Sequence, residues 1–109
     1  MDFADLVDRF AGRAGVTLPQ EPDRHAFGAG ALKVDGSIFA MEVRDRIVLK
    51  LPAVRVSQLI ADGTGEPFRN GKGRPMREWV ALTTDRASTL TRLAEEACAF
   101  VSRRGQPQR

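Results

Sequence analysis

At 109 residues, with 42% hydrophobic and 28% charged side chains, the chain is long enough for one packed domain and too short for two. That composition excludes global disorder, and the single cysteine excludes an intrachain disulfide or an all-cysteine metal site. The formal net charge is +3, yet the first 27 residues hold five of the fourteen acids and three of the seventeen Lys and Arg residues. The remainder is therefore basic and permits an anionic partner.

The beginning of the sequence, MDFADLVDRF, carries acids where a signal peptide has a basic region and an apolar run. No apolar stretch approaches the length of a membrane span. We therefore expect a cytoplasmic domain without a membrane partner.

A first helix is predicted from apolar residues at helical spacing, with acids on the other side. Asp2 is the expected N-cap and Gly15 the expected stop. Residues 16–26, which contain Pro19 and Pro22, are expected to be a connector. The apolar stripe consists of Phe3, Leu6, Val7, Phe10 and Ala14.

Three strand-like runs follow, and the turn residues set their expected register. Asp35-Gly36 predicts a two-residue type I′ turn that pairs Val34 with Ser37 and Leu32 with Phe39. Side chains alternate along a strand, so one face is expected to be buried. Its members would be Leu32, Val34, Phe39, Met41 and Val43.

The loop before the third run decides which of its side chains enter the core. A two-residue turn at Arg44-Asp45 would turn Val48 and Lys50 inward. A three-residue loop over residues 44–46 would turn the larger side chains of this run inward instead. Because a one-residue slip reverses every side chain, the three-residue loop is favoured. Its pairs would be Val43 with Ile47, Met41 with Leu49 and Phe39 with Leu51.

The second half of the chain predicts two more helices. Pro52 opens an apolar stripe of Ala53, Val56, Leu59 and Ile60 that Gly63 closes. Residues 63–75 are a glycine-rich loop, with a short strand near Phe68, and Met76 to Leu82 is a strand. Thr84 or Asp85 caps a final helix that Gly105 and Pro107 end, leaving residues 104–109 frayed. The fold class is α+β, a mainly antiparallel sheet in one domain over 1–109, with the order α-β-β-β-α-(β)-β-α.

This order, with GALKVDGSIFAMEVRDRIVLKLP and GEPFRNGKGRPMREWVAL, resembles the TfoX/Sxy N-terminal domain family over residues 27–101. The matching elements are the Gly30 to Phe39 hairpin, the Lys50-Leu51-Pro52 junction, residues 65–68 and Met76 to Trp79. The resemblance implies a bacterial regulatory domain, as in transcription or competence control. It extends to the MmcQ/YjbR group, whose fold is suggested to bind DNA.

Neither the lone histidine nor the lone cysteine has partners for chemistry in the sequence. His25 lacks the second histidine that a metal site or a nucleophile–base pair needs, and is expected to be a solvated loop residue. Cys98 falls on the apolar stripe of the last helix and is expected to be a buried thiol. The glycines match neither the phosphate-loop nor the dinucleotide spacing. We expect no catalytic residue, no metal and no cofactor.

Two surfaces remain as candidate binding sites. Arg69, Lys72, Arg74 and Arg77 are four cations within nine residues, either an arm that contacts phosphates weakly or a solvated loop. No aromatic residue interleaves these cations, so stacking on single strands is not expected. The second sheet face is expected to carry Ala31, Ala40 and a set that docks a partner or is covered by a helix. That set is Lys33, Ile38, Glu42, Val48, Lys50 and Trp79.

The sequence therefore predicts a non-enzymatic binding or regulatory domain. A protein partner or self-association as a dimer is expected, and nucleic acid is a weaker possibility. The alternative is a small-molecule-binding domain or an enzyme of unknown reaction, which a deep pocket lined by ionisable groups would favour.

Overall fold

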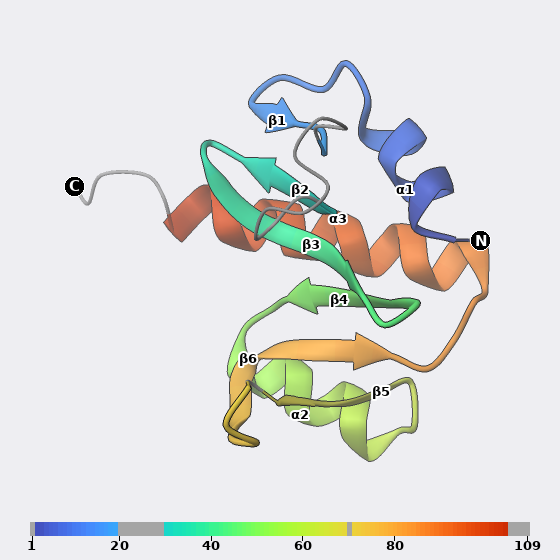
Figure 1. The fold of residues 1–109 in the computed structure, drawn as a ribbon, viewed down its shortest axis with the longest axis vertical. Helices are drawn as coiled ribbons and strands as arrows, with labels where there is room; N and C mark the ends of the chain where they lie inside the picture. The colour runs from blue at the N-terminus through green and yellow to red at the C-terminus, as the bar shows by residue number, and fades with distance from the viewer. Residues whose placement is uncertain (1, 20–29, 70, 105–109) are drawn as a thin grey trace.

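The computed structural model describes residues 2–19, 30–69 and 71–104. These residues form three helices and a six-stranded antiparallel sheet with the strand order β1-β2-β3-β4-β6-β5 (Figure 1). The predicted α+β class is confirmed. The elements in chain order are α1 (Phe3–Phe10), β1 (Val16–Thr17), β2 (Ala31–Val34), β3 (Ser37–Val43), β4 (Arg46–Lys50), α2 (Ala53–Ala61), β5 (Gly65–Arg69), β6 (Pro75–Leu82) and α3 (Ala87–Arg104).

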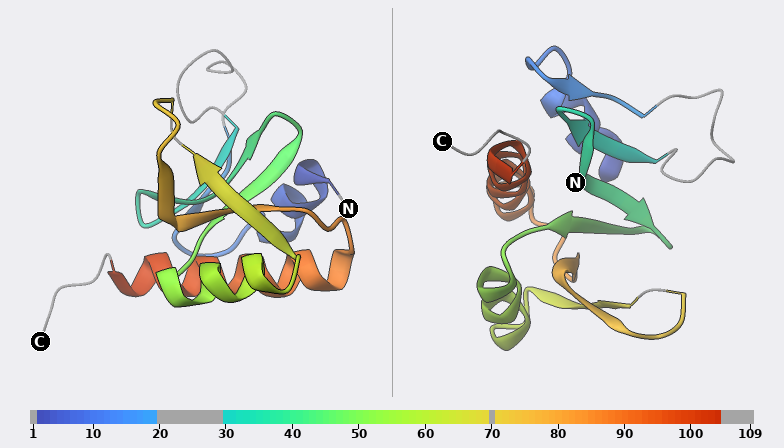
Figure 2. Two further views of the ribbon diagram at one scale, coloured as in Figure 1. Left: turned by 90° about the horizontal axis from the view of Figure 1, so that it is seen from below. Right: turned by 90° about the vertical axis from the view of Figure 1, so that its left-hand side faces the viewer.

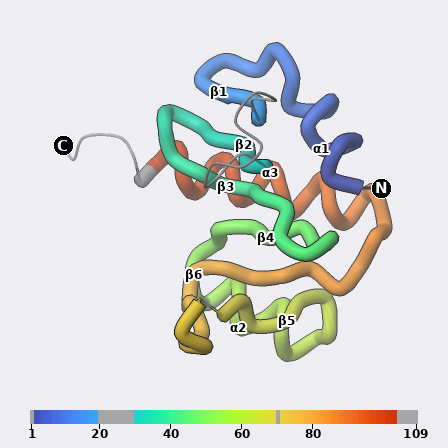
Figure 3. Tube along the Cα trace, in the orientation of Figure 1, coloured from blue at the N-terminus to red at the C-terminus, as the bar shows by residue number. Residues whose placement is uncertain are grey.

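The helices cover one face of the sheet. Helices α2 and α3 lie side by side beneath the strands (Figure 2), and Arg55 Nε of α2 donates to Glu96 Oε1 of α3 at 2.9 Å. Side chains from all three helices and from strands β2, β3, β4 and β6 share one hydrophobic core. The tube in Figure 3 shows that β4 and β6 are neighbours in the sheet although α2 and β5 separate them in the chain.

Helix α1 begins as predicted and ends earlier than predicted. The Asp2 carboxylate accepts from the Asp5 backbone N–H at 3.0 Å, and the Asp5 carboxylate accepts from the Asp2 N–H, a complete capping box. The prediction that the helix reaches Ala14 is wrong. Gly12 takes the left-handed conformation, with φ +81°, and the chain turns so that Val16 can pair with Val34. The predicted connector therefore contains β1, which the sequence analysis missed; its part over residues 20–26 lies outside the described residues.

The first hairpin has the predicted turn and an unpredicted irregularity. Asp35 and Gly36 both have positive φ, 51° and 85°, as a type I′ turn requires, and Val34 pairs with Ser37. Beyond Lys33, which pairs with Ile38, the register shifts, so that Leu32 faces Ala40. The predicted pair of Leu32 with Phe39 is wrong because β3 holds one extra residue here, a β-bulge.

The second hairpin has the turn that the sequence analysis rejected. Arg44 and Asp45 both have positive φ, 52° and 66°, and Val43 pairs with Arg46. The three-residue loop and its three pairs are therefore wrong. Glu42 faces Ile47 instead.

The two errors compensate each other in β4. The bulge in β3 reverses the alternation once, which is what the third loop residue was expected to do. Ile47, Leu49 and Leu51 are therefore buried in the core, as predicted, with exposed fractions of 8%, 0% and 0%. The bulge changes the faces of β3 instead. Met41 and Val43, which were predicted to face the core, are half-buried on the opposite face of the sheet.

The second half of the chain follows the prediction closely. Pro52 is the N-cap of α2, and Gly63, with φ +85°, ends it. The backbone N–H of Gly63 donates to Ile60 O and that of Thr64 to Leu59 O, which is the Schellman pattern. Strand β5 is longer than the short strand predicted near Phe68. Thr84 Oγ1 accepts from the Arg86 N–H at 3.2 Å just before α3. The frayed tail was predicted to begin at residue 104, but α3 includes Arg104, and residues 105–109 lie outside the described residues.

Candidate functional site

The β5–β6 hairpin gathers the four predicted cations at one end of the sheet. We call it the basic hairpin; its cations are Arg69, Lys72, Arg74 and Arg77, all exposed. Arg69 ends β5, and its Nη1 donates to the Gly73 carbonyl at 3.0 Å, which holds the connecting loop against the strand. Arg77 belongs to β6 and not to the loop. The structure therefore brings the cations together across two strands.

A cation and two aromatic rings lie in a row across β4, β6 and β5. Lys50 and Trp79 are direct cross-strand partners, and Lys50 Nζ lies 5.3 Å from the Trp79 ring centroid. The Phe68 ring lies on the other strand beside Trp79, with centroids 6.5 Å apart and planes at 53°. All three side chains are half-buried. We call the side of the sheet that they share, away from α2 and α3, the outer face.

Alternation assigns these residues to the outer face. Their strand neighbours Leu49 and Val80 lie in the core, so Lys50 and Trp79 point the opposite way. Arg77 is two residues before Trp79, in the part of β6 where the register with β5 shifts. In the sequence Phe68 and Trp79 flank the four cations, and the two rings meet only once β5 pairs with β6.

The predicted partner face is only partly assembled. Lys33, Ile38, Lys50 and Trp79 are half-buried, as a partly accessible surface requires. Val48 is 1% exposed and offers no area to a partner. The bulge also moves Ala40 into the core and Glu42 to the core side, where Glu42 pairs with Ile47. Val48, Ala40 and Glu42 are therefore removed from this candidate surface.

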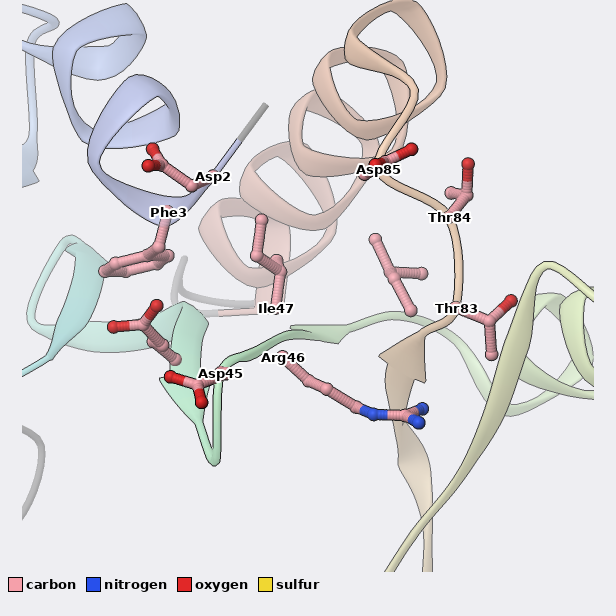
Figure 4. A pocket seen from close by; sticks show the side chains of 10 residues that line it. Asp2, Phe3, Asp45, Arg46, Ile47, Thr83, Thr84 and Asp85 are labelled. Carbon is pink, nitrogen blue, oxygen red and sulfur yellow. The ribbon is translucent and has the colours of Figure 1, made fainter.

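A pocket of about 270 Å³ lies at the far end of β6, where α1 begins, β3 turns into β4 and β6 leads to α3 (Figure 4). Asp2, Glu42, Asp45 and Asp85 line it. The Arg46 side chain points away from the three labelled carboxylates toward β5, where its Nη1 donates to Glu66 Oε1 at 2.7 Å. The pocket is thus predominantly acidic.

The acids of this pocket have a structural explanation. Helices α1 and α3 both begin beside it, and carboxylates stabilise the partial positive charge of helix N-termini. The backbone N–H of Asp5 lowers the pKa of Asp2, which caps α1. The volume of about 270 Å³ is also below the usual range for a ligand site, about 300–1,000 Å³. Among the described residues, no group of three or more His, Cys, Asp or Glu could hold a metal ion.

Cys98 is buried in the core, as predicted, with 7% exposure. Burial raises the pKa of its thiol, against a smaller lowering by Arg13. Arg13 itself forms a two-point ion pair with Glu95 of α3, with Nη2 at 2.7 Å from Oε2, and lies 4.5 Å over the Phe10 ring. These contacts attach the segment after α1 to α3. His25, the other candidate for chemistry, lies outside the described residues.

We expect the folded protein to protect Cys98 from alkylation. A raised thiol pKa leaves less thiolate at neutral pH, and burial blocks access to the little that forms. The rate of reaction with iodoacetamide at pH 7.5 should therefore be at least about tenfold lower for the folded chain than for the chain in urea. Equal rates in the two states would contradict this prediction.

No helix among the described residues has both the length and the apolar character needed to cross a membrane. No family model and no solved structure matches the chain. The chain is similar to an error-prone DNA polymerase of Mycolicibacterium paratuberculosis (strain ATCC BAA-968 / K-10), with 31% identity over 116 residues. The match takes in 90% of this chain and 11% of the polymerase, so the chain spans about a tenth of that protein's length. The similarity therefore concerns one segment of the polymerase.

Proposed function

We propose that this domain is a non-enzymatic nucleic-acid-binding module that contacts phosphates through the basic hairpin. The observation that carries the proposal is the separation of charge along β6. This strand starts at Pro75, beside the four cations, and ends at Leu82, beside the acidic pocket. A polyanion would meet the molecule at its basic end.

The two ends of β6 are far enough apart for solvent ions to screen the pocket carboxylates from the basic hairpin. From Arg77 to Leu82, five residue steps of β6 span about 16 Å at about 3.3 Å per residue. That is about two Debye lengths, about 8 Å each, at physiological ionic strength. The pocket carboxylates therefore do little to neutralise the basic hairpin. Two acids lie closer: the Glu66 carboxylate is bound to Arg46, with 2.7 and 3.0 Å contacts, and Glu78 follows Arg77 in β6.

The similarity to one segment of a DNA polymerase supports nucleic acid as the ligand class. Because of this similarity we favour nucleic acid as the ligand over the protein partner that the sequence analysis favoured. The resemblance to the TfoX/Sxy N-terminal domain implies a regulatory role for such binding. That role remains a prediction, since turn and core residues carry the resemblance.

Binding should be weak, independent of sequence and strongly dependent on salt. Contacts to phosphate position a protein without reading bases. Four contacts predict a log–log salt slope of about −3.6 on duplex DNA and about −2.8 on a single strand. Replacing the four cations of the basic hairpin with alanine should abolish binding in fluorescence anisotropy. The melting temperature should change little, because exposed charges contribute little to folding.

The matched control is the double substitution Arg92→Ala and Arg103→Ala on α3. Both residues are exposed cations of α3, and this helix covers the other face of the sheet (Figure 2), so this variant should keep most of the affinity. Undiminished binding by the fourfold variant would place the site elsewhere. If the unaltered protein bound neither DNA form at low salt, a protein partner would be the better proposal.

A further inference from the structure

The geometry points to a single strand as the ligand of the basic hairpin, with an unpaired base stacked on Trp79 in the place that Lys50 occupies in the free protein. This inference rests on the proposed function and names its substrate class. It is carried by the row of Lys50, Trp79 and Phe68 and not by the charges alone.

The aromatic pair has the form of a stacking platform. Trp79 and Phe68 come from the adjacent antiparallel strands β6 and β5, at the place where their register shifts, and are in ring contact. Both rings are half-buried, so packing fixes them while part of each stays accessible. Proteins that bind single strands without sequence preference combine such rings with a basic groove, because every base has a flat aromatic face.

The position of the Lys50 ammonium over the Trp79 ring indicates where the base would bind. The ammonium lies 5.3 Å from the Trp79 ring centroid, within the range of a cation–π contact. At a partly exposed site this contact is weaker than the stacking of a nucleobase on an indole. An arriving base can therefore displace the ammonium. The released charge is then free to contact a phosphate next to the stacked base.

The cations beside the platform fit a strand that runs along the hairpin. Arg77 lies two residues from Trp79 on the same strand, so the two residues are at most about 7 Å apart along β6. A backbone crossing Trp79 therefore meets a guanidinium within about one nucleotide. The bases of a duplex stay stacked on one another. The phosphates of a duplex would therefore contact the cations, and no base would stack on the two rings.

The chain has one tryptophan, so its fluorescence reports on Trp79 alone. We would titrate the protein at low salt with a labelled oligothymidine and with a duplex of equal length, following label anisotropy and tryptophan emission together. The inference predicts tighter binding of the single strand and quenching of Trp79 emission by it. The duplex should leave the emission unchanged.

Three substitutions separate stacking from charge. Trp79→Ala should weaken single-strand binding by roughly 5- to 150-fold, the range of one lost base–aromatic stack, without weakening duplex binding. Trp79→Phe keeps a ring and should retain most of the affinity, so it answers the objection that the alanine variant is poorly folded. With Lys50 as a fifth phosphate contact the single-strand salt slope becomes about −3.5, and Lys50→Met should return it to about −2.8 while preserving quenching.

The outcomes distinguish this inference from the function on which it rests. Binding of the single strand without any change in tryptophan emission would overturn stacking and leave the basic hairpin as a phosphate site. Tighter binding of the duplex than of the single strand, together with unchanged single-strand binding by Trp79→Ala, would also overturn stacking and leave the phosphate site. If neither probe bound the unaltered protein, the proposed function and this inference would both fall.

Discussion

Phe39→Ala should lower the free energy of unfolding by about 3–5 kcal/mol, the usual cost of truncating a fully buried aromatic residue. The Phe39 side chain is 0% exposed, and its ring packs against that of Phe10, with centroids 5.1 Å apart and planes at 60°. Phe39 also sits at the bulge of β3, so its loss leaves a cavity between α1 and the sheet. Urea denaturation monitored by circular dichroism measures the change.

Ile38→Ala is the neighbouring control. Ile38 precedes Phe39 in β3 and is only half-buried, so its truncation should cost clearly less. A loss below about 1 kcal/mol for Phe39→Ala, or an equal loss for both variants, would show that this side chain does not occupy the core as described.

Gly65→Ala should destabilise the domain by about 1–3 kcal/mol through overpacking. A Cβ atom at Gly65 would lie 2.3 Å from Val80 Cγ2 and 3.7 Å from Leu59 Cβ. Both neighbours belong to the core between α2 and the sheet. The branched Val80 side chain is anchored close to its own backbone and has little freedom to move aside.

The chain offers a matched control for this prediction. Gly71 has no heavy atom within 4 Å of its virtual Cβ, so Gly71→Ala should be nearly neutral. Adding Val80→Ala removes the atom that clashes. The double variant with Gly65→Ala should be more stable than the sum of the two single losses predicts, as a double-mutant cycle measures. Strict additivity would contradict the proposed clash.

Local turn chemistry explains which parts of the fold the sequence predicted. Asp35-Gly36, Pro52 and Gly63 each act on the few residues beside them, and each element boundary that they predicted is confirmed. The bulge at Phe39 has no such local signature. Regular alternation and a three-residue loop bury the same residues of β4 as a bulge and a two-residue turn, so the pattern alone does not separate the two solutions.

The candidate site was predictable only as far as it is local in sequence. The four cations of the basic hairpin were found because they are close neighbours in the chain. The platform was missed because Lys50 and Trp79 become partners only when β4 pairs with β6, across α2 and β5. Phe68 beside Arg69 and the alternation of Arg77 with Trp79 were the available signals. The acidic pocket joins three distant segments and left no pattern in the sequence.

The two outermost strands of the sheet limit how copies of this chain can associate. At one end β1 is two residues long, and at the other β5 carries Pro67 in its middle. A short edge offers few backbone groups to an incoming strand, and a proline has no N–H to donate. Strand-by-strand growth into fibrils is therefore disfavoured at both ends, which suits a small domain that carries exposed cations on the hairpin at one edge of its sheet.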